Sequence, residues 1–81
     1  MYTLYILKCC NGSLYTGITN DLDKRMQAHE AGKGSKYVRA HLPFSMIYSE
    51  EHADKSSAQK REWEIKSWSR KRKIKELGLV W

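Results

Sequence analysis

The strongest constraint on the fold lies near the start of the chain, where two strand-like segments flank a turn signal. The segments Tyr2 to Cys9 and Leu14 to Thr19 are rich in tyrosine, isoleucine, leucine and threonine, and most of these residue types favour β-strands. Between them lies Asn11-Gly12, a dipeptide typical of tight hairpin turns. This pattern predicts a β-hairpin.

Two loops fit this hairpin, and they differ in where the tyrosines point. A two-residue turn places Tyr5 and Tyr15 on opposite faces, because side chains alternate along a strand. A three-residue loop, Cys10-Asn11-Gly12 with a left-handed Gly12, pairs Tyr5 with Gly17. In that register both tyrosines share a face of the sheet.

A helix is expected directly after the hairpin. We expect Thr19 or Asn20 to cap it and the helix to run to about Glu30. Two acidic residues, Asp21 and Asp23, fall in its first turn, where the helix dipole favours negative charge.

One face of this helix mixes apolar and ionisable residues. At about 100° per residue, four side chains share one side: Leu22, Arg25, Met26 and His29. Leu22 and Met26 form an apolar stripe typical of a helix that faces a core. Arg25 and His29 either pack at the core boundary, as most such residues do, or belong to a functional site.

The middle of the chain predicts a loop and a third strand. Residues 31–43 contain glycine and serine and are expected to form a loop, and residues 44–51 are expected to form the strand. Ser56, with Gln59 three residues on, resembles a capping box that opens a helix to about Ser67.

A last helical segment is expected from Ser69 to Leu77, closing at Gly78. The resulting order is β-β-α-β-α-α. It predicts a small α/β (α+β) fold with a three-stranded, mainly antiparallel sheet flanked by helices.

The chain of 81 residues is long enough for one hydrophobic core, so we expect a single domain over residues 1–81. It contains no basic-then-apolar leader and no long apolar run, which predicts a soluble, cytoplasmic protein without a membrane partner. The adjacent Cys9 and Cys10 offer neither a disulfide framework nor a CxxC site. The three histidines match no zinc-binding spacing.

The positive charge of the chain indicates a polyanionic partner. The formal net charge is +6, and residues 51–81 hold nine Lys or Arg against five Asp or Glu. We expect nucleic-acid phosphate contacts from the basic run Arg70, Lys71, Arg72 and Lys73. A solvated helix end is the alternative, whereas an anionic membrane is disfavoured because the run offers little apolar surface.

A second basic segment lies in the predicted loop. The run Gly-Lys-Gly-Ser-Lys at residues 32–36 does not meet the Walker A spacing, and no hydrophobic strand precedes it, so a nucleoside triphosphate site is not expected. A loop that presents Lys33, Lys36 and Arg39 to a nucleic-acid backbone fits these residues, because such contacts need charge and reach.

Glu62 leans towards the core of the protein. It lies about 40° from the line through Ala58, Ile65 and Ser69, whereas Glu64 points away. A carboxylate in that place must be paired, hydrogen-bonded or bound to a metal ion. A salt bridge to Arg25 or another nearby cation is the alternative to a metal.

Taken in order, these residues resemble the GIY-YIG nuclease domain, in particular its small stand-alone bacterial branch. Thr3-Leu4-Tyr5 is followed ten residues later by Tyr15-Thr16-Gly17, and then by Arg25, His29 and Glu62. The ordered set is far more specific than any one member, and the resemblance covers nearly the whole chain.

The resemblance implies an endonuclease that hydrolyses phosphodiester bonds with one divalent ion, Mg²⁺ or Mn²⁺. It implies Glu62 as the metal ligand and Gly17 as a structural residue of the motif. The catalytic residues it implies are Tyr5, Tyr15, Arg25, His29 and Glu62.

The roles of the implied residues follow from their chemistry. Arg25 braces the charge on the phosphate, and Tyr15 positions the water or the phosphate. We expect Tyr5 rather than His29 to accept the proton, because nearby positive charge stabilises a phenolate. Two tyrosines that act on one phosphate must share a face, so we predict the three-residue register of the hairpin.

The chain departs from the family pattern in three places. The first triplet is Thr-Leu-Tyr rather than Gly-Ile-Tyr, Thr16 replaces the isoleucine of the second, and no asparagine follows Glu62 by about a dozen residues as in some members. No additional DNA-binding domain is present in the sequence, so sequence specificity is expected to be weak or supplied by a protein partner.

Two other functions remain open. The main rival is a non-catalytic DNA- or RNA-binding accessory module that retains the fold. A protein-interaction domain that uses Trp63, Trp68 and Trp81 leaves the positive charge unexplained. If the protein is a nuclease, DNA is favoured over RNA as the substrate.

Overall fold

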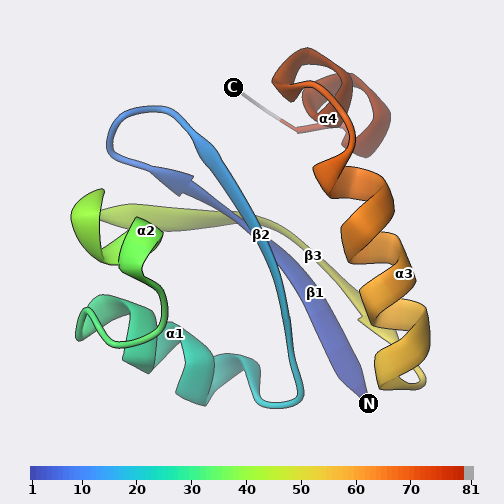
Figure 1. Cartoon of the computed structure of the whole chain (residues 1–81), viewed down its shortest axis with the longest axis horizontal. Helices are drawn as coiled ribbons and strands as arrows, with labels where there is room; N and C mark the ends of the chain where they lie inside the picture. The colour runs from blue at the N-terminus through green and yellow to red at the C-terminus, as the bar shows by residue number, and fades with distance from the viewer. Residues whose placement is uncertain (80–81) are drawn as a thin grey trace.

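Three strands form one antiparallel sheet in the order β2-β1-β3 (Figure 1). The computed structural model describes residues 1–79. The strands are β1 (Tyr2–Cys9), β2 (Leu14–Thr19) and β3 (Phe44–His52), and β1 pairs antiparallel with both neighbours. The central position of β1 leaves both of its faces to be covered by helices.

Four helices surround this sheet. They are α1 (Leu22–Glu30), α2 (Lys36–Ala40), α3 (Lys55–Lys66) and α4 (Arg70–Leu77). In Figure 1, α1 and α2 lie to one side of the strands and α3 and α4 to the other. The predicted α/β fold and element order are confirmed, with α2 as an added helix between α1 and β3.

The two faces of β1 carry separate halves of the core. Leu4 and Ile6 pack with Ile65 of α3 on one face. Tyr5 and Leu7 pack with Val38 of α2 on the other, together with partly buried side chains of α1. The alternation of a strand therefore sends the odd-numbered Tyr5 towards α1 and α2.

The hairpin adopts the three-residue loop. Tyr5 pairs with Gly17 and Leu7 with Tyr15, and the Cys9 N–H donates to the Ser13 carbonyl at 2.9 Å. Gly12 has a φ of 83°, the left-handed conformation that this loop needs and that glycine adopts without steric cost. The register predicted from the shared role of the tyrosines is confirmed.

The predicted cap of α1 is wrong by one or two residues. Asp21 caps α1, and its carboxylate accepts from the Lys24 N–H at 3.1 Å. Thr19, one of the two predicted caps, instead accepts a hydrogen bond from the Asp21 N–H at 3.1 Å. Aspartate is an equally strong capping residue, so sequence preference alone does not separate neighbouring candidates.

The start of α3 also differs from the prediction. Asp54 caps this helix and accepts from the Ser57 N–H at 2.8 Å, so Ser56 lies inside the helix and the predicted capping box does not form. Ser69 does not extend the buried line of α3, because it is exposed and caps α4, which ends at Gly78 with a φ of 63°.

The segment predicted as a loop contains the short helix α2. Its five residues begin after Ser35 and are anchored by Val38, which is fully buried. A helix this short has little intrinsic stability, and its packing against the core stabilises it. Within residues 1–79, no helix combines the length and the apolar character needed to span a bilayer.

Candidate active site

Tyr5 reaches the edge of the sheet because its partner on β2 has no side chain. A Cβ atom added to Gly17 would lie 2.6 Å from the Tyr5 hydroxyl and 3.3 Å from the Tyr15 ring. Glycine at this position therefore provides the space in which the Tyr5 phenol lies across the pairing strand. The predicted structural role of Gly17 has this physical basis.

His29 of α1 contacts both tyrosines. Its Nε2 atom forms a hydrogen bond with the Tyr5 hydroxyl at 2.9 Å, and its ring centroid lies 5.7 Å from that of Tyr15. The Tyr5 and Tyr15 ring centroids are 6.4 Å apart. The three side chains, which come from two strands and one helix, thus form one aromatic cluster under the edge of the sheet.

Gly34 closes the other side of the histidine ring. A Cβ atom at this position would lie 2.5 Å from His29 Nδ1 and within 3.0 Å of two ring carbons. His29 is fully buried, and Nδ1 has no hydrogen-bond partner among the described residues. The loop between α1 and α2 therefore fixes the position of the imidazole by close packing.

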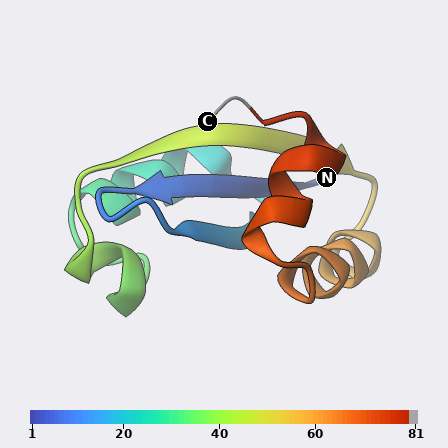
Figure 2. The same ribbon diagram turned by 90° about the horizontal axis from the view of Figure 1, so that it is seen from above.

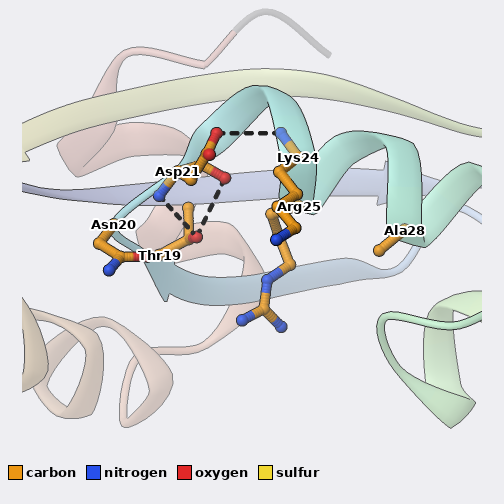
Figure 3. A pocket seen from close by; sticks show the side chains of 6 residues that line it. All are labelled: Thr19, Asn20, Asp21, Lys24, Arg25 and Ala28. Carbon is orange, nitrogen blue, oxygen red and sulfur yellow. Dashed lines mark hydrogen bonds between the residues drawn. The ribbon is translucent and has the colours of Figure 1, made fainter.

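Arg25 lies one helical turn before His29 and extends past β2. Figure 3 shows its guanidinium pointing away from α1 and beyond the strand, with Asp21, Lys24 and Ala28 along the same hollow. The Arg25 charge acts on both groups: it opposes the raising of the Tyr5 pKa by burial, and it adds to the lowering of the His29 pKa by burial. The guanidinium is therefore close to the hydrogen-bonded pair and open to an anionic ligand.

Glu62 approaches the same group from α3. Its side chain is 14% exposed, forms an ion pair with Lys66 at 3.1 Å, and acts to raise the pKa of Tyr5. Glu64 is 54% exposed and pairs with Arg61. The predicted inward and outward orientations of the two carboxylates are confirmed, and Lys66 rather than Arg25 is the cation beside Glu62.

The five predicted catalytic residues therefore converge at the edge strand β2. Figure 2 shows β2 at one edge of the sheet with α2 and α3 extending beyond it on either side. The convergence involves four elements, β1, β2, α1 and α3, and the site opens at the edge where no fourth strand pairs.

Burial dominates the protonation of the Tyr5 and His29 pair. Burial is the largest influence on Tyr5 and raises its pKa well above the usual value for tyrosine, against the opposing charge of Arg25. Burial, with Arg25 second, lowers the pKa of His29 below its usual value. In the protein without a bound cation, Arg25 does not outweigh burial, so Tyr5 and His29 are both neutral at neutral pH, and a Tyr5 phenolate in the presence of Mg²⁺ stays a prediction.

The predicted backbone-binding residues lie in two places. Lys33, Lys36 and Arg39 line a hollow of about 440 Å³ beside the loop that packs on His29. On α4, Lys73 lines a second hollow. The Arg72 guanidinium lies 4.8 Å from the centroid of the Trp68 ring, so part of its surface is used in packing.

The other two members of the α4 run, Arg70 and Lys71, are exposed. Trp68 is partly buried in the core, and Trp63 is 63% exposed. The third tryptophan of the interaction-domain alternative, Trp81, lies outside the described residues.

Two residues of the site were not singled out from the sequence. Gly34 was considered only as part of a phosphate loop, although glycine close to a predicted site histidine indicates a tight approach. Tyr37 lies in the segment predicted as a loop, yet its ring stacks with that of Tyr15 at a centroid distance of 6.3 Å. No signal in the sequence placed Tyr37 there, because the helix that carries it was not predicted.

Comparisons with known proteins agree with this geometry. The family described as the GIY-YIG catalytic domain matches residues 1–75, a span that includes all five converging residues. A UPF0213 protein of Bacillus pumilus is 51% identical over 69 residues, which cover 85% of this chain and 70% of the relative. A UPF0213 protein of Staphylococcus saprophyticus is 47% identical over 72 residues, which cover 89% of this chain and 88% of the relative.

A solved structure supports the same relationship. The solution NMR structure of a UPF0213 protein from Bacillus halodurans is similar to this chain with a TM-score of 0.63 and 39% sequence identity. The similarity covers 96% of this chain and 84% of the other.

Proposed function

This chain belongs to the GIY-YIG catalytic domain family, and from that membership we propose that it is a metal-dependent endonuclease. It hydrolyses phosphodiester bonds in nucleic acid, with DNA favoured over RNA and with weak sequence specificity. The observation that carries the proposal is the hydrogen bond between Tyr5 and His29, with Arg25 and Glu62 near enough for their charges to act on the pKa of Tyr5.

The residues present fit a single hard cation. Mg²⁺ in phosphoryl-transfer sites is typically held by one or two carboxylates, with water and substrate phosphate as the other ligands. Glu62 is such a carboxylate, and the Lys66 ammonium beside it shows that the position already attracts positive charge. Within residues 1–79, no group of three His, Cys, Asp or Glu side chains forms a closed metal cage.

Glu62 would hold the ion, Mg²⁺ or Mn²⁺, and a bound ion supplies charge neutralisation at the phosphate and the leaving oxygen. A cation held by Glu62 would compete with the Lys66 ammonium that pairs with this carboxylate, and Lys66 could then face the substrate phosphate. Arg25, whose guanidinium is already directed beyond β2, stabilises the charge that builds on the phosphoryl oxygens.

Tyr5 and His29 act together as the proton acceptor. The 2.9 Å hydrogen bond joins the Tyr5 hydroxyl and His29 Nε2, and the proposed route uses the tautomer in which the hydroxyl donates to Nε2. As the attacking water forms its bond to phosphorus, its proton passes to the Tyr5 oxygen while the phenol proton passes to Nε2, and the bond to the leaving oxygen breaks. Solvent protonates the leaving oxygen. His29 then returns its proton to the Tyr5 oxygen as the Tyr5 hydroxyl proton passes to solvent, which restores the resting pair.

The substrate makes this transfer possible. Burial and Arg25 disfavour a protonated His29 in the free protein. A phosphate anion at the site brings negative charge that offsets this penalty, so the pair accepts a proton only when substrate is bound. Tyr15, in contact with both rings, positions the phosphate or the water.

The proposal is tested by incubating the protein with labelled single-stranded, duplex and branched DNA and RNA, in Mg²⁺, in Mn²⁺ and in a chelator. We expect internal cleavage that requires the metal and is faster on DNA. Binding without cleavage in either metal would contradict the proposal and support the accessory module instead.

A further inference from the structure

A second hollow adjoins the proposed active site, and most of its lining has no role in the chemistry described above. It has a volume of about 420 Å³, within the range of small-molecule sites. Its lining comes from four elements and consists of Leu14, Tyr15, Thr16, Tyr37, Lys66 and Lys73. Tyr15 belongs to both the hollow and the catalytic cluster, so whatever binds in the hollow lies next to the scissile phosphate.

The Tyr37 ring is held in place before any ligand binds. Its hydroxyl donates to Ser13 of the hairpin, its ring stacks with Tyr15 at an angle of 17°, and it contacts the His41 ring at 4.5 Å. Despite these contacts Tyr37 remains 41% exposed. A large aromatic surface that is both fixed and exposed is suited to stacking, because little side-chain entropy is lost on binding.

The charges at the hollow complement a phosphate. Lys66 and Lys73 come from successive helices and both line it. Lys66 pairs with Glu62 at 3.1 Å, yet its charge still acts on Lys73, since burial and, after it, the proximity of Lys66 lower the pKa of Lys73. The two ammonium groups therefore repel one another across the hollow. An anion between them would remove this repulsion, whereas the tyrosine and leucine surfaces favour an apolar, planar group.

We propose that the hollow binds one unpaired nucleotide of the substrate strand, with its base against the stacked Tyr15 and Tyr37 and its phosphate between Lys66 and Lys73. This inference rests on the proposed nuclease function and specifies its substrate class. A base within a duplex is already paired and stacked, and taking it out costs free energy. Single strands and unpaired junctions are therefore bound more tightly than blunt duplexes.

The test is a binding measurement in a chelator, so that no cleavage occurs. Fluorescence anisotropy compares a short single-stranded DNA with its blunt duplex, for the wild type and for Tyr37→Leu. We expect Tyr37→Leu to weaken single-strand binding by roughly 5- to 100-fold, the range for loss of one base stack, and to change duplex binding little. Trp63→Leu is the matched control, since Trp63 is an exposed aromatic outside the hollow.

A second measurement uses the unaltered protein and does not depend on the folding of a variant. A strand that carries the fluorescent base 2-aminopurine at successive positions should show quenching at one position near the cleavage point, as stacking on an aromatic ring predicts. The wild type should bind a strand that is abasic at that position more weakly than it binds the intact strand. Tyr37→Leu should bind the two strands equally well. Lys73→Gln should weaken binding of the intact strand more than Lys60→Gln does.

Absence of quenching at every position, or equal losses on single strand and duplex, would overturn the inference. These outcomes are separable from failure of the proposed function. If the protein stacks an unpaired base on Tyr37 but cuts no nucleic acid, the proposed nuclease function is refuted. The assignment of the hollow as a nucleotide site then still stands. A protein whose Tyr37→Leu variant binds and cuts single strands as well as the wild type does would refute the hollow while leaving the nuclease in place.

Discussion

The Tyr5 and His29 pair carries the chemistry of the proposed reaction, and each member is neutral when the substrate is absent. Burial opposes ionisation of both groups, raising the pKa of Tyr5 and lowering that of His29. Neither is an effective base alone. Because the two groups are hydrogen-bonded, the phenol can accept one proton while it gives another to His29.

Replacement of Tyr5 by Phe removes only the hydroxyl, so the packing of the ring survives. We expect the single-turnover cleavage rate to fall by roughly 10² or more, as for loss of a general base. His29→Ala should also slow cleavage, because Nε2 is then absent. Urea unfolding of both variants would separate a chemical loss from instability, since Tyr5→Phe leaves a buried nitrogen without its partner.

The pH dependence of the single-turnover cleavage rate distinguishes proton transfer through the Tyr5 and His29 pair from catalysis by a Tyr5 phenolate. Cleavage through neutral His29 should be constant around neutral pH and fall only as the pH drops through the lowered pKa of His29, below its usual value near 6.5. A phenolate base would instead give a rate that keeps rising towards the raised pKa of Tyr5. A continuous rise that disappears in Tyr5→Phe would contradict the pair.

Gly34 fixes the position of the His29 imidazole, so its replacement should disturb the site. A methyl group at Gly34 would collide with His29 Nδ1 and displace either the ring or the loop. Gly34→Ala should therefore lower the cleavage rate and shift the NMR resonances of His29, whereas Ser35→Ala in the same loop should do neither. Unchanged His29 resonances in Gly34→Ala would show that the loop yields instead of the ring. Gly34 has no positive φ that would confuse the result with backbone strain.

The anchoring of α3 matters because this helix carries Glu62. Glu50 of β3 accepts hydrogen bonds from Tyr48 on the same strand and from Arg61 of α3, and pairs with His52 at 2.5 Å. These donors lower the pKa of the Glu50 carboxyl, although burial acts in the opposite direction. The network ties α3 to the edge strand β3, on the side of the sheet away from β2.

Glu50→Gln should destabilise the fold by about 1 to 3 kcal/mol, because it weakens charge-assisted hydrogen bonds and leaves Arg61 with less compensation. The free energy of unfolding in urea measures this effect, with the exposed neighbour Glu51→Gln as the control. The difference in the free energy of unfolding between the two variants should vanish at low pH, because protonation then removes the Glu50 charge that Glu51→Gln retains. Equal stabilities at neutral pH would contradict a role for the network.

The elements differ in how well the sequence predicts them, for physical reasons. The strands and α4 were predicted because alternation, Gly12 and Gly78 are local signals. The hairpin register was open on local grounds and was decided only by the requirement that Tyr5 and Tyr15 act together. The helix α2 was missed because the burial of Val38, a tertiary contact, stabilises it.

The same reasoning applies to the site. The motif spacing identified Tyr5, Tyr15, Arg25, His29 and Glu62, and these residues converge. The direction of the Tyr5 pKa was not predicted, because the depth of its burial depends on the space at Gly17 and on the packing of Val38. Counting nearby charges does not reveal how strongly burial raises the pKa of Tyr5 in the protein without a metal ion.

Across the molecule, the cations lie on both sides of the site. Lys33, Lys36 and Arg39 belong to the α1–α2 side and the basic run of α4 to the other, with β2 between them (Figure 1). A nucleic-acid strand that crosses the edge strand β2 would meet both groups of cations. Such an arrangement would neutralise phosphates without reading bases, which is the basis of the weak sequence specificity that we propose.

Neutral replacement of Arg70, Lys71, Arg72 and Lys73 should weaken binding to all sequences alike. The dependence of log K on log salt should become shallower, by about 0.7 to 0.9 for each phosphate that the protein no longer neutralises. Titrations at several salt concentrations measure this slope, with the loop variant of Lys33, Lys36 and Arg39 for comparison. Because Arg72 packs on Trp68, its replacement is checked for stability. An unchanged slope would place the α4 run off the binding surface.

The central claim is that this chain cuts nucleic acid through a metal ion held by Glu62. The most direct measurement is the single-turnover cleavage rate in Mg²⁺ for Glu62→Gln beside Glu64→Gln, with nucleic-acid affinity determined in parallel. We predict that Glu62→Gln abolishes cleavage and leaves binding unchanged or slightly tighter, and that Glu64→Gln, whose side chain is exposed, cuts like the wild type. Normal Mg²⁺-dependent cleavage by Glu62→Gln would contradict the account.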